Sequence, residues 1–373
     1  MAAFEIFQNS KSSSSQYQLK NPPSDGISCL RFSNKVRSDA LLVSSWDGTL
    51  KLYDTKLDSV RWKHTLDGNV PILCCDFAAD DDSLGITGCL DGKIRTHSFG
   101  ASGTKPSAGR AFPVGHDGGV SCIGWSSETN LACSGGWDKK LCTWDVRSTG
   151  GLSASTDLPG KAFSLSISSE NKVVVACSER NILIYDLRNL SKPQQVRQSS
   201  LQQQIRTIEC STPEIGAYAI GTVDGRVAIE YFDPENHIKK KFAFKCHRQK
   251  EDVQINNNVD RHPSKSSDVN KEKATVAYPV NAIAFHPTFG TFATGGGDGM
   301  VVTWDAINRK RITQYSKYPT SIAALSFNHD GSRLAIASSY TYEKGEMDDK
   351  PQDAVYVRVI KKDEVQPKSK KKI

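Results

Sequence analysis

The chain has 373 residues, of which 38% are hydrophobic and 24% are charged, and its formal net charge is +7. This balance is typical of a folded globular protein and excludes a chain that is disordered throughout. No apolar run reaches the roughly 18 residues that a membrane-spanning helix needs. The opening MAAFEIFQNSKSSSSQ has no apolar stretch of the kind found in secretory signals. We therefore expect a protein of the nucleus or cytoplasm with no membrane partner.

The positive charge is concentrated in two segments. Residues 237–273 carry a net charge of +5 and residues 361–373 a net charge of +4, which leaves −2 for the rest of the chain. A protein that reads DNA or RNA needs basic side chains over a broad face, so we expect no direct sequence-specific nucleic-acid binding. The tail QPKSKKKI is interpreted as a solvated, disordered end. Nuclear import and weak nucleic-acid binding are alternatives for it that the sequence leaves open.

A repeated block recurs along most of the chain. Each copy has small residues, a tight acidic turn, an apolar strand and a polar stop, as in SSWDGTLKLYD, SGGWDKKLCTWD and TGGGDGMVVTWD. Successive turn acids are 44, 47, 41, 45 and 74 residues apart. The first four intervals match the period of WD repeats, about 40–45 residues, and the last equals one repeat plus a long insertion. The turn acids are Asp47, Asp91, Asp138, Glu179, Asp224 and Asp298.

A seventh, degenerate block follows these six. It starts at YPTSIAALSFNHDGSRLAIASSY, resumes at AVYVRVI and lacks an outer strand. Short apolar or alternating runs bounded by Gly, Asp, Asn and Pro predict strands, and no stretch has a sustained helical period. The sequence therefore predicts an all-β, seven-bladed WD-repeat β-propeller. The segment around Tyr17–Leu19 is expected to supply the missing strand of the last blade and so to close the ring.

Three stretches are expected to lie outside regular blade structure. The propeller is placed at residues 17–360, with a flexible N-terminus at residues 1–16 and a basic disordered tail at residues 361–373. Residues 249–277 are polar and rich in Asn, Lys and Ser. They are predicted to form a disordered insertion between the fifth and sixth blades.

No catalytic or metal-binding signature is present in the sequence. It has no H-E-x-x-H, no G-x-S-x-G and no P-loop, and its ten cysteines lie mostly in apolar strand-like runs without zinc-site spacing. We interpret the turn acids as structural, each hydrogen-bonding within its blade. A histidine in the preceding loop, such as His116, is expected to join that network, with Trp144 and Trp304 in the buried wall. The sequence thus predicts a protein that is not an enzyme and holds no cofactor and no metal.

Two tryptophans break this structural pattern. Trp46 and Trp137 precede the turn acid in SSWD and GGWD, where the turns of the top face are expected to meet solvent. An exposed indole is unusual on a stable surface and is a common anchor for a partner segment. The alternative is that each ring packs over an adjacent blade.

Basic side chains gather in the fifth repeat. Arg206 lies in QQQIRTIEC, Arg226 follows the turn in VDGRVAIEY, and Lys245 and His247 lie in FAFKCHR. Arginine presents a planar fork and lysine a compact charge, so together they can hold a phosphorylated side chain of about −1.5 to −2 charges. The alternative is a set of solvated surface cations.

The chain resembles the spindle-assembly-checkpoint WD-repeat propellers of the "budding uninhibited by benzimidazoles" type. The segments that carry the resemblance are YQLKNPPSDGISCLRFS, SSWDGTLKLYD, IEYFDPE, KKKFAFKCHR and YPVNAIAFHPTFGTFATGGGDG, and the match runs from about Tyr17 to Ile360. A sister family, the messenger-RNA-export propellers of the nuclear pore, shares GRVAI and KCHR, and the ending ASSYTYEKG is similar to it. The segments NPPSDGIS, SSWDGTLKLYD and EYFDP favour the checkpoint family.

The resemblance implies two ligands for the top face. One is the acidic GLEBS segment of a checkpoint kinase and of its pseudokinase-like relative. In the family this segment faces the Trp of S-S-W-D and the Arg of the Q-x-R strand, here Trp46 and Arg206. The other is a phosphorylated Met-Glu-Leu-Thr repeat of the outer-kinetochore scaffold. The two positions at which the propeller family binds the phosphate match Arg226 and Lys245 here. Trp137 is included with the GLEBS contacts, although Gly stands before it where the family has Ser.

The resemblance further implies a role and a location. The chain would be a monomeric propeller in hetero-complexes that recruits checkpoint kinases to unattached kinetochores. It would lie in the nucleus, at kinetochores in mitosis and partly in the cytoplasm. The export family instead implies binding to the GLEBS segment of a pore protein, so cellular position separates the two interpretations.

Overall fold

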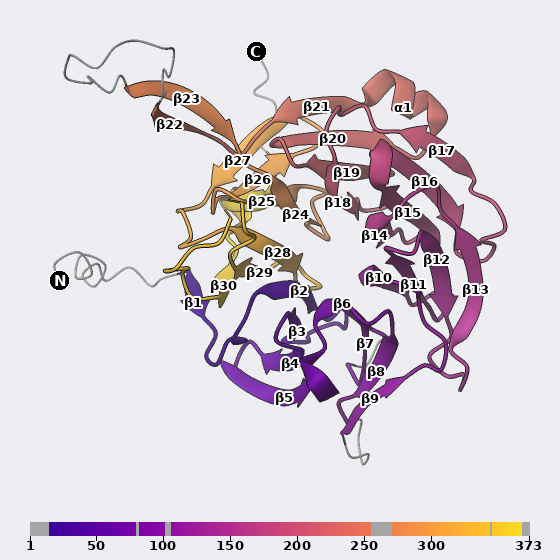
Figure 1. Ribbon diagram of the computed structural model, residues 1–373. Coiled ribbons are helices and arrows are strands. Elements are labelled where there is room, and N and C mark those ends of the chain that lie inside the picture. Colours follow the sequence, from indigo (N-terminus) through magenta and orange to yellow (C-terminus); the bar gives the residue numbers. More distant parts are fainter. Residues whose placement is uncertain (1–14, 80–81, 101–105, 255–270, 344, 368–373) are drawn as a thin grey trace, which may run out of the picture.

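Seven four-stranded antiparallel sheets stand around a central channel like the blades of a propeller (Figure 1). This is the arrangement in the computed structural model, which describes residues 15–79, 82–100, 106–254, 271–343 and 345–367. The seven blades predicted from the six turn blocks and the degenerate seventh block are therefore confirmed. No helix in these ranges is long and apolar enough to cross a membrane.

In six blades the strands follow one another from the channel outward in chain order. Blades 1 to 3 consist of β2 (Ile27–Phe32), β3 (Ala40–Ser45), β4 (Thr49–Asp54), β5 (Ser59–Thr65), β6 (Ile72–Phe77), β7 (Leu84–Cys89), β8 (Ile94–Ser98), β9 (Ser107–Ala111), β10 (Val120–Ser126), β11 (Leu131–Gly136), β12 (Lys140–Trp144) and β13 (Leu152–Asp157). Blades 4 to 6 consist of β14 (Ala162–Ile167), β15 (Lys172–Cys177), β16 (Asn181–Asp186), β17 (Gln195–Gln198), β18 (Ile205–Cys210), β19 (Ala217–Thr222), β20 (Arg226–Tyr231), β21 (Phe242–Lys245), β24 (Val280–Phe285), β25 (Phe292–Gly296), β26 (Val301–Asp305) and β27 (Lys310–Gln314).

The seventh blade is built from both ends of the chain. Its strands, from inside to outside, are β28 (Ile322–Phe327), β29 (Arg333–Ser338), β30 (Ala354–Val359) and β1 (Gln16–Gln18). Tyr17 pairs with Val357, and the backbone N–H of buried Leu19 donates to the carbonyl of Val355 at 2.8 Å. The predicted closure of the ring by an N-terminal strand is confirmed, and it covers a sheet edge that would otherwise be open.

The hydrophobic core is divided into seven clusters, one between each pair of neighbouring blades. All six residues of β3 are buried, as are the first five of β4, whereas the outer strand β5 alternates between exposed and half-buried residues. A blade has neighbours on both faces, so its middle strands need apolar side chains on both. This requirement explains the continuous apolar runs in the sequence.

A hydrogen-bonded tetrad links the turn and strands of blade 3, as the sequence predicted. The indole Nε1 of Trp144 donates to Ser134 Oγ at 2.7 Å, and that hydroxyl lies 2.8 Å from His116 Nε2. The other ring nitrogen of His116 lies 2.9 Å from the turn acid Asp138. The turn acid thus holds the loop before the blade to its inner strands.

Blade 6 has a second tetrad, which corrects the expected place of His247. His247 is buried, and its Nδ1 lies 2.8 Å from the turn acid Asp298 while its Nε2 lies 2.8 Å from Thr294 Oγ1. Trp304 Nε1 donates to the same hydroxyl at 2.9 Å. His247 is therefore structural and does not belong to the exposed basic cluster in which the sequence placed it.

The insertion at 249–277 is more ordered at its ends than predicted. The strands β22 (Arg248–Gln254) and β23 (Lys271–Ala277) pair antiparallel from Arg248 with Ala277 to Gln254 with Lys271. They project from the ring as a separate hairpin (Figure 1). The prediction of a wholly disordered insertion is wrong for these ends, because backbone pairing compensates for their polar composition. Residues 255–270 lie outside the described residues.

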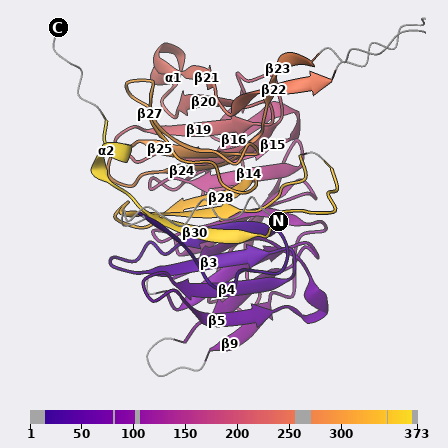
Figure 2. The same cartoon turned by 90° about the vertical axis from the view of Figure 1, so that its left-hand side faces the viewer.

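The predicted tail at 361–373 is also partly regular. Helix α2 (Lys362–Val365) contacts β26 and β27 at one side of the ring (Figure 2). Val365 is 1% exposed, and Thr303 Oγ1 donates to the Glu364 carbonyl at 2.7 Å. The prediction of a disordered tail is therefore wrong for Lys362–Val365, and residues 1–14 and 368–373 lie outside the described residues. The remaining elements are η1 (Asp67–Asn69), η2 (Ser178–Arg180) and α1 (Pro234–Lys240).

Three charged side chains from innermost strands interact electrostatically across the ring. Arg31 of blade 1 approaches Glu209 of blade 5 at 4.0 Å, which links two blades that are not neighbours. Asp76 of blade 2 accepts the backbone N–H of Trp125 at 3.0 Å. Burial raises the pKa of Glu209 to about 7 and also raises the pKa of Asp76, with Arg31 opposing both shifts.

Glu209 makes the stability of the ring depend on pH. Its pKa in the folded chain, about 7, lies above the value of about 4.3 in an unfolded chain. The folded state therefore binds this proton more tightly, and the contribution of Glu209 to stability is lost as pH rises from about 4.3 to 7. We expect Glu209→Gln to raise the Tm relative to wild type at pH 8 more than at pH 5. Parallel Tm profiles for the two proteins over this range would contradict the assignment.

Candidate functional site

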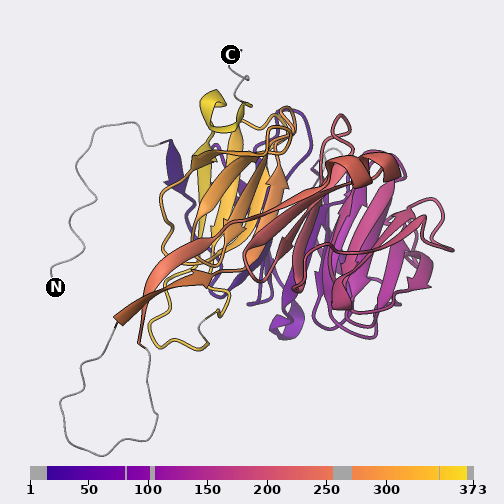
Figure 3. The same ribbon diagram turned by 90° about the horizontal axis from the view of Figure 1, so that it is seen from above.

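One face of the ring carries the tight turns between the second and third strands of the blades, and we call it the top face. The hairpin β22–β23 leaves the ring on this side, whereas α1 and α2 lie toward the opposite, bottom face (Figure 3). Each innermost strand begins at the top face, where the preceding outer strand ends. The five predicted binding residues all stand at such turns or strand ends, so all of them lie at the top face. They are Trp46, Trp137, Arg206, Arg226 and Lys245.

The second residue of every innermost strand forms a β-bulge. In all seven blades the pairing with the next strand shifts register at this position. A bulge re-aims a side chain, and here all seven side chains line the channel, a cavity of about 820 Å³. The seven residues are Ser28, Leu73, Ser121, Phe163, Arg206, Asn281 and Ala323.

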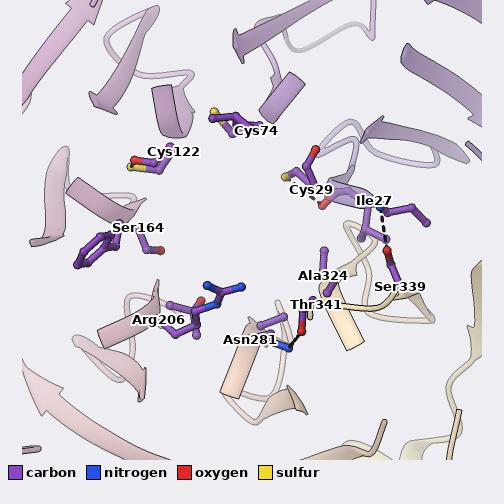
Figure 4. A pocket seen from close by; sticks show the side chains of 18 of the residues that line it. Ile27, Cys29, Cys74, Cys122, Ser164, Arg206, Asn281, Ala324, Ser339 and Thr341 are labelled. Atoms are coloured by element: carbon purple, nitrogen blue, oxygen red, sulfur yellow. Dashed lines mark hydrogen bonds between the residues drawn. The ribbon is translucent and has the colours of Figure 1, made fainter. Parts of the chain in front are cut away.

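Arg206 is the charged member of this set. Ser28, Ser121 and Asn281 each donate to the carbonyl at the start of the next blade, at 2.5, 2.7 and 3.1 Å. Arg206 instead extends into the channel (Figure 4), and no described residue forms a hydrogen bond or ion pair with its guanidinium. The Arg206 side chain is exposed to solvent. Partial desolvation by the channel wall nevertheless lowers the pKa of its guanidinium. Its position suits an anionic ligand that enters from the top face.

The two tryptophans lie at the mouth of the same channel. Trp46 is 44% exposed and Trp137 is 36% exposed, and both line the cavity that Arg206 enters. Each ring rests on a glycine of the loop before its own blade. A Cβ on Gly119 would come within 2.8 Å of the Trp137 ring, and one on Gly26 within 3.4 Å of the Trp46 ring. The structure thus brings Trp46, Trp137 and Arg206 together, with part of each indole open to solvent.

The sequence missed two apolar residues, one at a turn of the top face and one in the channel. Leu90, 37% exposed, precedes the turn acid of blade 2 and so occupies the same position as Trp46 and Trp137. Its place in the repeat could have identified it. Phe163 is the bulged residue of blade 4, and no sequence signal marks a bulge, so only the structure could place it in the channel.

Arg226 and Lys245 face one another on adjacent strands. They are directly paired in the antiparallel ladder of β20 and β21, at the outer edge of blade 5. Like charges directly opposite in a sheet are destabilising, so this pair is costly unless an anion lies between or above the two cations. Arg226 also forms an ion pair with Asp224 at 2.9 Å. Lys245 is exposed.

A third cation stands beside this pair. Arg248, which the sequence did not single out, donates to the backbone carbonyl of Asp224 at 3.0 Å. Arg248 lies in the same KCHR segment as Lys245, so the sequence could have predicted that these two cations are close together. Arg226 and Lys245 do not line the channel cavity that holds Arg206. Blade 5 therefore carries two separate basic sites, one at its inner edge and one at its outer edge.

The described residues contain no group of three or more His, Cys, Asp or Glu side chains that could hold a metal ion. The cysteines are unpaired, and burial raises the pKa of Cys122 and of Cys210 to about 12. The thiols of Cys122 and Cys210 therefore stay protonated at neutral pH and pack as small apolar side chains.

Comparison with known proteins agrees with this geometry. The family model for the WD domain, G-beta repeat, matches residues 13–54, 61–98, 110–145 and 271–305. The chain is 44% identical over 359 residues to mitotic checkpoint protein BUB3.1 of Arabidopsis thaliana, with 95% of each chain covered. It is 40% identical over 355 residues to mitotic checkpoint protein bub3 of Dictyostelium discoideum, covering 93% of this chain and 95% of that protein.

The sister family is also related, at lower identity. The mRNA export factor GLE2 of Chaetomium thermophilum is 30% identical over 334 residues, which covers 88% of this chain and 85% of that protein. These two checkpoint relatives are 44% and 40% identical to the chain, whereas the export factor is 30% identical. The chain belongs to the BUB3 family of mitotic checkpoint WD-repeat propellers.

Proposed function

We propose that this chain is a spindle-checkpoint adaptor whose top face binds two peptide segments at once. The observation that carries the proposal is the arrangement of blade 5, with Arg206 at the channel, where no described residue pairs with it, and Arg226 facing Lys245 at the outer edge. A ring without a catalytic signature and with two separate basic sites is suited to joining partners. The chain is proposed to be monomeric and not an enzyme, and to act at kinetochores in mitosis and otherwise in the nucleus and cytoplasm.

The first ligand is proposed to be the acidic GLEBS segment of a checkpoint kinase and of its pseudokinase-like relative. Arg206 supplies a charge-assisted contact for an acidic side chain. The open faces of Trp46 and Trp137 supply apolar anchors on blades 1 and 3. A segment that reaches all three residues must cross the mouth of the channel, which covers part of the top face.

The second ligand is proposed to be a phosphorylated Met-Glu-Leu-Thr repeat of the kinetochore scaffold. The phosphate would lie between Arg226 and Lys245 and relieve the repulsion of two facing cations. A phosphate carries more charge and more acceptor oxygens than a threonine hydroxyl. The pair should therefore prefer the modified segment.

The second candidate function is messenger-RNA export at the nuclear pore, where a related GLEBS segment would occupy the same channel mouth. It is favoured by the similarity to the export factor GLE2. The deciding experiment is localisation in mitosis-arrested cells together with recovery of partners by pulldown. Kinetochore signal with a checkpoint kinase supports the checkpoint function, whereas pore signal with a pore protein and an empty kinetochore contradicts it.

Removing an anchor at the channel mouth should weaken GLEBS binding. Trp46→Ala is expected to raise the Kd by about 30-fold, because the loss of an interfacial tryptophan costs about 2 kcal/mol. Calorimetric titration with the GLEBS peptide measures the change. Leu57→Ala is the control, since Leu57 is 72% exposed in the turn between β4 and β5 on the bottom face. An unchanged Kd for Trp46→Ala removes Trp46 from the interface.

Removing one phosphate-binding cation should weaken only the phosphorylated peptide. Arg226→Ala is expected to raise its Kd by about 10- to 100-fold, because a hydrogen bond to a charged group contributes about 1.5–3 kcal/mol. GLEBS binding should stay unchanged, and added salt should weaken the phosphopeptide complex. Fluorescence titration of phosphorylated and unphosphorylated peptides checks both statements.

Arg188→Ala is the matched control for this titration. Arg188 also pairs with an aspartate two residues before it, Asp186 at 2.5 Å, but at the end of β16 that faces the bottom. It should leave both affinities unchanged. Equal binding of the two peptides by the wild type, or full phosphate preference in Arg226→Ala, would show that this pair does not read phosphothreonine.

A further inference from the structure

A second, smaller cavity opens beside Arg206 at the top face. Its volume is about 290 Å³, and its wall joins the start of blade 6 to the loop between β29 and β30. The cavity has one cation and one carboxylate among its lining side chains. They are Arg206 and Glu343.

The loop holds Glu343 at this cavity through several contacts. Thr341 Oγ1 donates to the Glu343 carboxylate at 2.5 Å, and Asn281 Nδ2 donates to Thr341 Oγ1 at 3.2 Å. Asn281 in turn donates to the carbonyl at the start of blade 7 at 3.1 Å. The carboxylate is therefore tied to the bulge next to that of Arg206.

Glycine at position 297 leaves space for the Glu343 carboxylate. Gly297 precedes the turn acid of blade 6 and so occupies the position that Trp46 and Trp137 hold in blades 1 and 3. A Cβ on Gly297 would lie 2.8 Å from a Glu343 carboxylate oxygen and 3.1 Å from its Cγ. An indole at this position would exclude Glu343 from the cavity.

The charges of Arg206 and Glu343 act on one another without direct contact. Desolvation lowers the pKa of Arg206, and the charge of the Glu343 carboxylate opposes that shift. No ion pair within 4.0 Å joins them among the described residues, so the guanidinium keeps its donors for an external ligand. An incoming carboxylate would meet those donors and, at the same time, the negative charge of Glu343.

The geometry points to Glu343 as a built-in competitor that lowers the affinity of the Arg206 site for acidic segments. In the free protein its carboxylate neutralises part of the field of Arg206. When a partner's acidic side chain binds, the two like charges repel one another, and Glu343 must move away or become solvated. This inference rests on the proposed binding of an acidic segment at Arg206.

Such a competitor would keep the complex reversible and selective. A segment anchored only by charge would be repelled, whereas one that also covers Trp46 and Trp137 would bind in spite of the repulsion. The loop would thus make affinity depend on the apolar anchors as well as on the acid. Because the charges are partly exposed, the effect should shrink as ionic strength rises.

The test is calorimetric titration of the full chain and of Glu343→Gln with the acidic GLEBS peptide of a checkpoint kinase. Gln keeps the size of the side chain and an acceptor for Thr341 but removes the charge. The variant should bind about 2- to 5-fold more tightly at low salt, as expected for a partly screened charge pair, and the gain should fall toward 1-fold at 1 M salt. Affinity equal to or weaker than that of the wild type overturns the inference.

A matched control lies in the same loop. Glu346 is exposed and does not line the cavity, so Glu346→Gln makes the same change in net charge and should leave the Kd unchanged. If it tightens binding as much as Glu343→Gln, the effect is one of net charge and the inference fails.

A double-mutant cycle separates this inference from the proposed function. On an Arg206→Ala background, Glu343→Gln should no longer tighten binding. If Arg206→Ala itself leaves the wild-type affinity intact, the proposed site is wrong. If Arg206→Ala weakens binding but Glu343→Gln has the same effect in both backgrounds, the proposed binding site at Arg206 is supported and the role of Glu343 as a competitor is wrong.

Discussion

Face-to-face packing between neighbouring blades is the interaction on which the rest of this structure depends. Each of the seven apolar clusters joins two blades, as Ile184 of blade 4 meets Ile220 of blade 5. Burial of apolar side chains is the main favourable term in folding, and here all seven interfaces form only when the ring is closed. The insertion of Leu19 beside Val355 completes the last of these interfaces. Because every blade is held on both faces, the turns at the top face are fixed relative to one another.

That rigidity would allow the ring to hold the two proposed ligands on its top face without a deep active site. The same bulge in every innermost strand turns seven side chains into the channel, and one of them is a cation. Both edges of blade 5 then carry positive charge, with Arg206 inside and Arg226 paired to Lys245 outside. Local features that destabilise a sheet, such as facing like charges, are tolerated because packing on both sides supplies the stability.

Much of this could be predicted, because WD repeats encode short-range structure. The Asp-Gly turn at Asp47 and the Trp before it are both local, so their place at the top face followed from the spacing of the repeats. Other predictions failed where long-range contacts decide. His247 looks like a surface cation beside Lys245, yet a buried hydrogen bond joins it to Asp298, 51 positions later in the sequence. The ends of the insertion and tail look disordered by composition, but strand pairing and the burial of Val365 order them.

The amino-acid sequence by itself determined the seven-fold repeat, the closure by the N-terminal strand and the position of each candidate residue along its blade. These properties depend on the hydrophobic period and on turn chemistry, and both are set by residues close together in the sequence. Only the tertiary structure decided which residues share a surface. It placed Phe163 in the same channel as the tryptophans, separated Arg206 from Arg226, and set Glu343 against Gly297. Curvature of the ring and the bulge of each inner strand govern these neighbours, and neither leaves a signal in the order of the residues.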